Sequence, residues 1–293
     1  MEEIRPGIFV ETKTRGCNPG YVVTSDGIVV IDTPQLPTQA VAMYNAVRKL
    51  GPIRYIINTE LHIDHIFGNY YFKDVEHILA HRATVEKWMT PDPDFDPFDY
   101  AHEAIPTHDP EGESLFPARD VYYANPNKAD IVVDGDTELK VGNKTFQILH
   151  TPGHTQGQLT VVIKEDKTAF VGDTLFHGCQ TWLHASDVET WLKTLDRLLE
   201  VDMELIVPGH GPVCNKQEIY VQRAFLMEWV TAVAVAIGKG WSREKCVKEI
   251  SFLDRFPVDI GQEYMGETVN RNNAGSLYDK LTKKMAVMPK LGG

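Results

Sequence analysis

Residues 58–69 read NTELHIDHIFGN, and this short stretch contains an unusual density of potential metal ligands. His62, Asp64 and His65 fall within four residues, and Glu60 stands two positions before the first of them. Imidazole and carboxylate groups are the usual protein ligands of zinc, iron and manganese. The apolar segment before Glu60, IRYIINT, has the composition of a short β-strand. The stretch therefore predicts a metal site at the end of a strand.

Three further candidate ligands also follow predicted strands. His154 lies in TPGHTQG between two β-rich runs, Asp173 follows TAFVG, and His210 follows LIVPG. Strand ends can hold loop residues rigidly around a common point, and neighbouring glycines and prolines allow the tight turns that this requires. We therefore expect all these side chains to converge on one site.

The order of these motifs resembles that of the metallo-β-lactamase superfamily. The family pattern is H-x-H-x-D-H, followed by a histidine in a G-H-T turn, an aspartate in G-D and a histidine in G-H. The corresponding segments here are ELHIDH, TPGHTQGQL, VGDTLF and VPGHG, and the resemblance covers roughly residues 1 to 215. It implies a four-layer αββα sandwich, two divalent metal ions (zinc, manganese or iron) and a metal-bound hydroxide as the nucleophile.

The resemblance also implies roles for individual residues. Metal site one would be Glu60, His62 and His154; site two would be Asp64, His65 and His210, with Asp173 bridging both ions. Asp64 would also act in catalysis as a proton shuttle. Two bound cations lower the pKa of a shared water, so such a site would serve hydrolysis at neutral pH.

Glu60 departs from the family pattern, which has histidine at this position. A glutamate ligand adds negative charge to site one, which favours harder ions such as manganese or iron, although zinc also accepts carboxylate. The alternative is that Glu60 turns away and leaves site one weak or empty. A member of the family that has lost its metal is a further alternative.

The residues that follow Asp173 are candidates for substrate contacts. His177 and His184 flank the segment GCQTWL on the side where family members often bind substrate, and Trp182 within it belongs either to the core or to the pocket wall. Cys179 lies in the same segment, but no general base is evident beside it, so we expect it to be inert. No basic cluster for the carboxylates of glutathione is visible in the sequence, which disfavours an activity like that of glyoxalase II.

The remaining sequence alternates between strand and helix signals. Ser25-Asp26-Gly27 separates two β-rich runs and predicts a hairpin. A helix is expected after Pro37, with Val41, Tyr44, Val47 and Leu50 on one face, and another after Ser186 as N-cap, with Glu189 completing a capping box. The buried stripe of the second helix is expected to be Val188, Trp191, Leu192, Leu195 and Leu199.

These signals predict an α/β fold, the four-layer αββα sandwich, over residues 1–215. An inserted aromatic-rich loop segment, about residues 88–130, would either roof the active site or form a subunit interface, so a homo-oligomer is one alternative. Residues 216–293 are expected to form a C-terminal helical extension packed on this domain. In it, the apolar stretch from Trp229 to Gly238 is too short to cross a bilayer.

Net charge, the first residues and the cysteine spacing indicate which classes of binding partner and which cellular location to expect. The net charge of −12 argues against nucleic acid, which requires a basic surface. The charged start, MEEIRPGIFVETKTRG, lacks the apolar core of a signal peptide, and the four cysteines form no C-x-x-C pair. We therefore expect a cytoplasmic protein that acts on a small molecule, with neither nucleic acid nor membrane as a partner.

The leading hypothesis is a dinuclear metallohydrolase that acts on an ester, thioester, lactone or activated aryl ether. The second is an iron-dependent oxidoreductase of the same fold, because an extra carboxylate favours iron. The third is a non-catalytic, ligand-binding member of the family.

Overall fold

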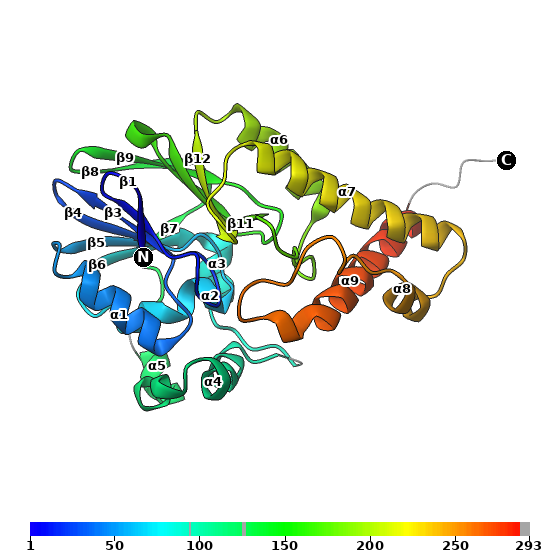
Figure 1. Ribbon diagram of the computed structural model, residues 1–293, viewed down its shortest axis with the longest axis horizontal. Helices are drawn as coiled ribbons and strands as arrows, with labels where there is room; N and C mark the ends of the chain where they lie inside the picture. The colour runs from blue at the N-terminus through cyan, green and yellow to red at the C-terminus, as the bar shows by residue number, and fades with distance from the viewer. Residues whose placement is uncertain (94, 125–126, 288–293) are drawn as a thin grey trace.

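Two β-sheets pack face to face in the computed structural model, which describes residues 1–93, 95–124 and 127–287 (Figure 1). The first sheet runs β1-β2-β3-β4-β5-β6-β7; it is antiparallel from β1 to β4 and parallel from β4 to β7. Its strands are β1 (Glu2–Arg5), β2 (Ile8–Val10), β3 (Gly20–Thr24), β4 (Gly27–Ile31), β5 (Ile53–Ile57), β6 (Val75–His81) and β7 (Ile131–Val133).

The second sheet runs β12-β11-β10-β9-β8, and only its β11–β12 pair is parallel. Its strands are β8 (Thr137–Val141), β9 (Lys144–His150), β10 (Leu159–Ile163), β11 (Thr168–Phe176) and β12 (Leu205–His210). A single turn of 3₁₀ helix, η3 (Lys164–Asp166), links β10 to β11. Every residue of β10 and β11 is buried, which explains their continuous apolar runs.

The space between the sheets is filled by β-branched and aromatic side chains from both. Val29, Ile31 and Ile57 of the first sheet pack with Phe146 and Val161 of the second. Strands with one face toward this layer and the other toward a helix are buried on both faces. This layer is the main core that fixes the position of the strand ends.

Helices cover the outer faces of both sheets, so the predicted four-layer sandwich is confirmed (Figure 1). Helix α1 (Pro37–Val47) packs on the first sheet, and α6 (Val188–Glu200) lies against the second. The buried face of α1 differs from the expected one, because Ala40 and Met43 are buried with Tyr44 and Val47 while Leu50 is exposed beyond the helix end.

The hairpin predicted at Ser25-Asp26-Gly27 is confirmed, but the residue predicted to cap the start of α6 is wrong. Thr24 pairs with Gly27 across the predicted turn. The N-cap of α6 is Asp187 and not Ser186: its carboxylate accepts hydrogen bonds from the backbone N–H groups of Glu189 and Thr190. Ser186 instead donates its hydroxyl proton to the carbonyl of Leu183. The buried stripe of α6 contains Thr194 and Leu198, with Leu192 and Leu199 only partly buried.

The aromatic-rich insertion is mostly helical where an irregular loop was expected. After α3 (Arg82–Lys87) it contains α4 (Pro97–His108), η2 (Pro110–Leu115) and α5 (Arg119–Ala124); residues 94, 125 and 126 of the predicted segment lie outside the described part. Its aromatic rings stack on Phe67, with centroid distances of 4.8 Å to Tyr122 and 5.2 Å to Phe116. Phe67 begins η1 (Phe67–Tyr71), directly after α2 (Ile63–Ile66), so the insertion packs against the HIDH motif.

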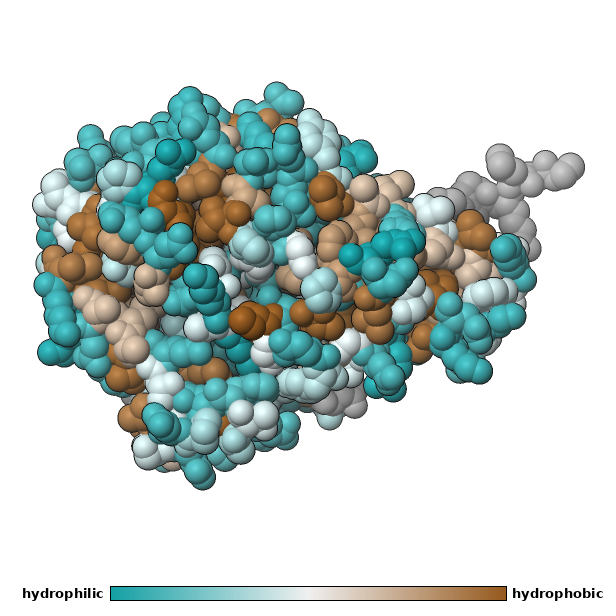
Figure 2. Space-filling model, in the orientation of Figure 1, coloured by the Kyte–Doolittle hydropathy of each residue, from teal (hydrophilic) through white to brown (hydrophobic). Residues whose placement is uncertain are grey.

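The C-terminal extension consists of α7 (Gln217–Gly238), α8 (Arg243–Glu249), η4 (Glu263–Met265) and α9 (Gly266–Val287), and the predicted break lies between α8 and η4. Residues 288–293 of the predicted extension lie outside the described part. Leu226, Trp229 and Val233 of α7 are buried in one core with Trp191 and Leu195 of α6. Figure 2 shows hydrophobic residues where the sandwich meets the extension, and further hydrophobic patches among hydrophilic residues over the sandwich.

Helix α7 is longer than the apolar stretch that marked it in the sequence. By length and composition alone it could cross a membrane, and 33% of the residues in its most apolar window are buried in this fold. Leu226, Trp229 and Val233 form its buried face, which packs in one core with α6.

Candidate functional site

Two glycines shape the turns that carry the candidate ligands. Gly172 precedes Asp173 and adopts φ +49°; a Cβ there would lie 2.3 Å from Nε2 of Gln158. Gly209 precedes His210, and a Cβ there would lie 1.9 Å from Oδ1 of Asp173. Only glycine can occupy these positions without displacing the strand ends. The apolar strands thus deliver their polar ends to one place.

A first donor cluster contains Glu60, His62, His154 and Asp173. Nδ1 of His62 lies 2.6 Å from Oε1 of Glu60 and 3.2 Å from Nε2 of His154. Nε2 of His154 lies 3.2 Å from Oδ2 of Asp173. Glu60 therefore points into the cluster; the alternative that it turns away does not describe this structure.

A second donor cluster contains Asp64, His65 and His210. Nε2 of His210 lies 3.3 Å from Oδ2 of Asp64 and 3.4 Å from Oδ1 of Asp173. Nε2 of His65 lies 3.1 Å from the same oxygen of Asp173. Asp173 thus directs Oδ2 at the first cluster and Oδ1 at the second.

The spacing of these donors suits metal ions. Ligands on a tetrahedral zinc, with bonds of 2.0–2.1 Å, lie about 3.3 Å apart. Five donor separations in the two clusters, from 3.1 to 3.4 Å, match this value, and the 2.6 Å between His62 and Glu60 is shorter, as in a hydrogen bond. Oε2 of Glu60, Nε2 of His65 and Oδ1 of Asp173 are buried without a hydrogen-bond partner. Buried polar atoms are rarely left unsatisfied, and a bound cation would satisfy all three. The residues present therefore fit two metal ions.

A carboxylate behind each of two histidines fixes the ring. Asp32, buried at the end of β4, lies with Oδ2 2.9 Å from Nδ1 of His65. Asp32 adopts φ +54° and accepts hydrogen bonds from the backbone N–H and hydroxyl of Thr59, at 2.7 and 2.6 Å. Asp259, in the break before η4, lies 2.7 Å from Nδ1 of His210. Such partners keep the proton on Nδ1 and leave Nε2 free to bind a metal.

His154 is held by the backbone instead, because its Nδ1 lies 3.1 Å from the carbonyl oxygen of Trp182. The ring of His154 also packs edge-on against Trp191, at a centroid distance of 5.3 Å. Trp191 is fully buried and belongs to the core under α6. The third imidazole is thus oriented by the fold itself.

The electrostatics of the metal-free site couple the carboxylates to the imidazoles. Burial opposes ionisation of Asp173, but His210 and His65 outweigh burial and hold the pKa of its carboxyl well below its ordinary value. Burial likewise opposes protonation of His210, yet the charge of Asp173 raises the pKa of His210 well above its ordinary value. His65 follows the same pattern, with a raised pKa. In the absence of metal these histidines hold protons that a cation would replace.

A cavity of about 890 Å³ opens onto both donor clusters. Besides five of the donors, it is lined by insertion residues that include Met89, Phe95 and Tyr100, and by Gln262, Met265 and Thr268 of the extension. The insertion therefore lies over the active-site cavity, as one of its two predicted roles requires. The extension closes another side of the same cavity.

Of the three predicted substrate contacts, two line this cavity. The side chains of Trp182 and His184 are on its wall, and the ring of His184 lies 5.5 Å from that of His62. His177 does not line the cavity: its Nδ1 lies 2.8 Å from the carbonyl oxygen of Pro212, where the turn after β12 holds it. Burial raises the pKa of Cys179 to about 12, which agrees with an inert thiol.

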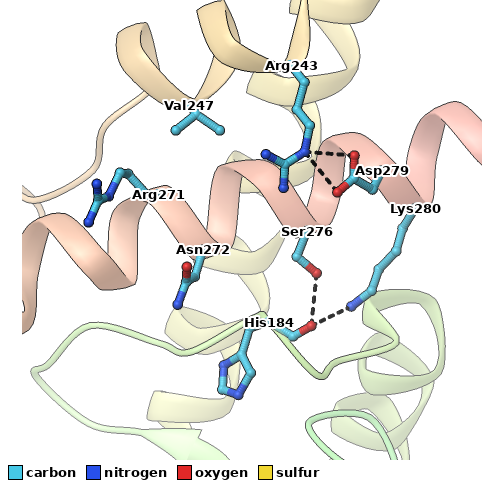
Figure 3. A pocket seen from close by; sticks show the side chains of 8 residues that line it. All are labelled: His184, Arg243, Val247, Arg271, Asn272, Ser276, Asp279 and Lys280. Carbon is cyan, nitrogen blue, oxygen red and sulfur yellow. Dashed lines mark hydrogen bonds and ion pairs between the residues drawn. The ribbon is translucent and has the colours of Figure 1, made fainter. Parts of the chain in front are cut away.

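A second cavity, of about 570 Å³, adjoins the first and contains the basic cluster that the sequence did not reveal (Figure 3). His184 and Asn272 line both cavities. Nε of Arg243 lies 2.9 Å from both carboxylate oxygens of Asp279, and Lys280 donates to the carbonyl of His184. No ion pair or hydrogen bond of the Arg271 side chain occurs within the described residues. These cations come from α8 and α9, so only folding brings them together.

Two carboxylates that contact the donor histidines, Asp32 and Asp259, were not among the site residues predicted from the sequence. Asp32 had a visible signal, since it follows the apolar run GIVVI in the same way that Asp173 follows TAFVG. Asp259 had none, because it lies in an irregular segment 49 residues from the histidine it contacts.

Comparison with known proteins agrees with this architecture. The profile described as "Metallo-beta-lactamase superfamily" matches residues 12–210. A metallo-beta-lactamase family protein from Thermus thermophilus, TTHA1429, superposes with a TM-score of 0.68 at 18% identity, over 99% of this chain and 97% of that one. At this identity the superposition shows the fold alone.

Among curated proteins, human acyl-coenzyme A thioesterase MBLAC2 is 28% identical over 169 residues, which are 56% of this chain and 58% of that protein. Hydroxyacylglutathione hydrolase GloC of Haemophilus influenzae is 39% identical over 77 residues, or 25% of this chain and 36% of that protein. The match therefore spans little more than half of the first relative and about a third of the second.

Proposed function

This chain belongs to the metallo-β-lactamase superfamily, and from that premise we propose that it is a dinuclear metal-dependent hydrolase of thioesters. The observation that carries the proposal is the pair of donor clusters that share Asp173 at the floor of one cavity. Glu60, His62 and His154 would hold one divalent ion, and Asp64, His65 and His210 the other. Zinc, manganese and iron all accept this donor set.

When bound, such ions would lower the pKa of a water molecule and polarise the substrate carbonyl. The protein's own groups supply the rest of the chemistry. Asp64 lies on the cavity wall and its pKa is held low by His65 and His210 despite burial, so it is ionised and can accept a proton. We assign to it the transfer of a proton to the departing thiolate.

The loop after β11 and the roof provide the binding groups. Trp182 and His184 flank the His62 side of the cavity, and burial lowers the pKa of His184 to about 3. A neutral imidazole at that position can donate one hydrogen bond to a substrate oxygen without repelling a bound cation. Met89 and Phe95 of the roof offer apolar surface to an acyl chain.

A thioester is favoured over the other predicted substrates for two reasons. The relatives that match this chain include proteins named as thioesterases and a hydroxyacylglutathione hydrolase. The adjoining cavity holds Arg243, Arg271 and Lys280, and this suits a thiol that carries phosphate groups, such as coenzyme A. The protein as a whole carries a net charge of −12, so this group of basic side chains makes the charge of the cavity differ from that of the rest of the surface.

The buried Glu60 supports a second candidate function. Together with Asp64 and Asp173 it gives the site three carboxylates, a donor set that favours iron. An iron-dependent oxidoreductase of the same fold would consume dioxygen during turnover, and a hydrolase would not.

The test is a substrate panel on protein reconstituted separately with zinc, manganese and iron. Coenzyme A thioesters, N-acetylcysteamine thioesters, lactones and aryl esters would be compared, with free thiol and dioxygen both recorded. We expect metal-dependent release of thiol without dioxygen uptake, fastest with coenzyme A thioesters. Hydrolysis of lactones alone would contradict the assigned substrate class, and dioxygen-dependent turnover would favour the oxidoreductase.

A further inference from the structure

A buried arginine lines the cavity that opens onto the metal-binding clusters. The Arg15 residue is only 7% exposed, and no carboxylate in the described part of the chain forms an ion pair with it. Burying a charge without a counter-charge is costly, so a protein rarely keeps such a group without a partner. Arg15 therefore requires an explanation that the hydrolytic site does not supply.

The partners of Arg15 identify what is missing. Nη1 of Arg15 donates to Oε1 of Gln35, and Nη2 lies 3.5 Å from the hydroxyl of Tyr100. Because the amide oxygen of Gln35 accepts from the guanidinium, its Nε2 remains available to donate to a group other than Arg15. Both this Nε2 and Nε of Arg15 are buried without an acceptor. Two donors without an acceptor, beside an uncompensated positive charge, define a receptor for an anionic oxygen group.

The side chain is held in place and is not free to leave the cavity. A Cβ at Gly261, which has φ +71°, would lie 2.9 Å from Cβ of Arg15, so the chain of the extension passes directly over the arginine stem. Gln35 is itself 3% exposed. The receptor is therefore formed before a ligand arrives, which reduces the entropic cost of binding.

The receptor lies beside Asp64, whereas the basic cavity lies beside His62. Arg15 adjoins Gly16, where an added Cβ would lie 3.2 Å from Cβ of Asp64. The basic cavity is reached past His184, which packs beside His62. A thioester whose sulfur lies between His62 and Asp64 would thus direct its thiol portion past His62 and its acyl chain toward Arg15.

We propose that Arg15, Gln35 and Tyr100 bind a carboxylate at the end of the acyl chain, so that the substrate is the thioester of a dicarboxylic acid. This inference rests on the proposed thioester hydrolysis and specifies its substrate. Arg15 provides the charge and the planar fork that matches a carboxylate, Gln35 adds an N–H donor, and Tyr100 adds a hydroxyl.

The experiment compares glutaryl with valeryl and monomethyl-glutaryl thioesters of N-acetylcysteamine on the metal-loaded enzyme. These compounds share the reacting bond and lack phosphate, so only the acyl end differs. We expect the wild type to prefer the glutaryl thioester about ten-fold or more in kcat/KM, mainly through KM. Arg15→Gln should remove this preference, so that glutaryl and valeryl thioesters have equal kcat/KM in the variant, because charge-assisted contacts to the acyl end are then lost.

Three further variants separate binding from folding. Arg15→Lys keeps the charge but not the fork and should retain part of the preference, and Tyr100→Phe should lower it by removing one hydroxyl. Arg223→Gln is the matched control: it removes the same charge from an exposed residue whose Nε pairs with Asp196, and it lines neither cavity. It should behave as wild type.

Failure of the inference is distinguishable from failure of the proposed function. Equal hydrolysis of all three thioesters by the wild type would overturn the carboxylate receptor and leave thioesterase activity standing. If no thioester is hydrolysed, the proposed function fails, and calorimetric titration of the metal-loaded protein with glutarate decides the receptor separately. Binding that weakens about ten-fold or more in Arg15→Gln supports it; binding that is absent or unchanged overturns it.

Discussion

The carboxylate of Asp259 lies 2.7 Å from Nδ1 of His210, so the C-terminal extension reaches into the candidate metal centre. His210 ends the last strand of the sandwich, and Asp259 lies in the irregular segment before η4. Gln262 and Met265 of the same extension line the cavity above. The extension therefore orients a ligand and shapes the binding space, in addition to covering the core.

Replacing Asp259 by asparagine should lower metal affinity about 10- to 100-fold, because the ring of His210 loses the carboxylate that orients it and raises its basicity. The affinity would be measured by competition with a chromogenic chelator. Asp254→Asn is the control, since Asp254 is exposed and, within the described part of the chain, pairs only with Arg255 at the surface. Unchanged affinity in Asp259→Asn would mean that His210 is not a ligand or needs no such support.

Changing Glu60 to histidine should shift the metal content toward zinc. The substitution removes one negative charge from the first cluster and supplies a softer nitrogen donor. Elemental analysis by plasma mass spectrometry of protein purified without added metal measures this directly. Glu200→His, an exposed change on α6, should leave the content unchanged. If Glu60→His has the same metals as wild type, Glu60 does not ligate.

Metal affinity should increase with pH between about 6 and 8. The pKa values of His65 and His210 are raised in the metal-free site, so these rings carry protons in that window that a cation must displace. The pKa values of Asp64 and Asp173 are lowered, so their carboxylates stay ionised and contribute no change there. Each displaced proton gives up to about a ten-fold increase in affinity per pH unit.

Calorimetric titrations in buffers of different ionisation enthalpy would count the protons released on metal binding. Release should continue throughout this window, because the pKa values of both rings are raised well above their ordinary value, and should fall only where the pH rises through those raised values. An affinity that does not vary with pH, with no proton release, would contradict the protonation assigned to the two histidines.

Leu226→Ala should lower the free energy of unfolding by about 2–5 kcal/mol, because it leaves a cavity in a packed core. Leu226 is fully buried in the cluster that joins α7 to α6 and the second sheet. Val235→Ala on the same helix is the control; Val235 is 50% exposed, and its truncation should change stability by less than about 0.5 kcal/mol. Chemical denaturation measures both. Equal effects would mean that α7 does not share the core of the sandwich.

The strands and the donor clusters could be predicted from sequence because their signals are local. Apolar runs such as TAFV and LIV end in turns that deliver Asp173 and His210, and the short motif from Glu60 to His65 supplies most of the other donors. The helical insertion could not be predicted in the same way. Its helices are short and contain prolines such as Pro106, and they are stabilised by aromatic stacking on Phe67.

Long-range groupings also escaped prediction. The approach of Asp259 to His210, and of Arg15 to Tyr100, joins segments that no local pattern connects. The basic cavity is assembled from Arg243, Arg271 and Lys280 on two helices, and no charge run in the sequence marks it. Cytoplasmic location and the division of the chain into a domain over residues 1–215 and an extension over residues 216–293 stay predictions.

The most direct test of the central claim is the rate of thioester hydrolysis by metal-free protein as metal is added back in measured equivalents, for the wild type and for Asp173→Ala. Asp173 contacts both clusters, so its loss should weaken both ions at once while the fold is kept. We predict no activity without metal, a wild-type rate that rises until two equivalents are bound, and no recovery in Asp173→Ala. Full activity in the metal-free protein, or an unchanged rate in Asp173→Ala, would contradict the account.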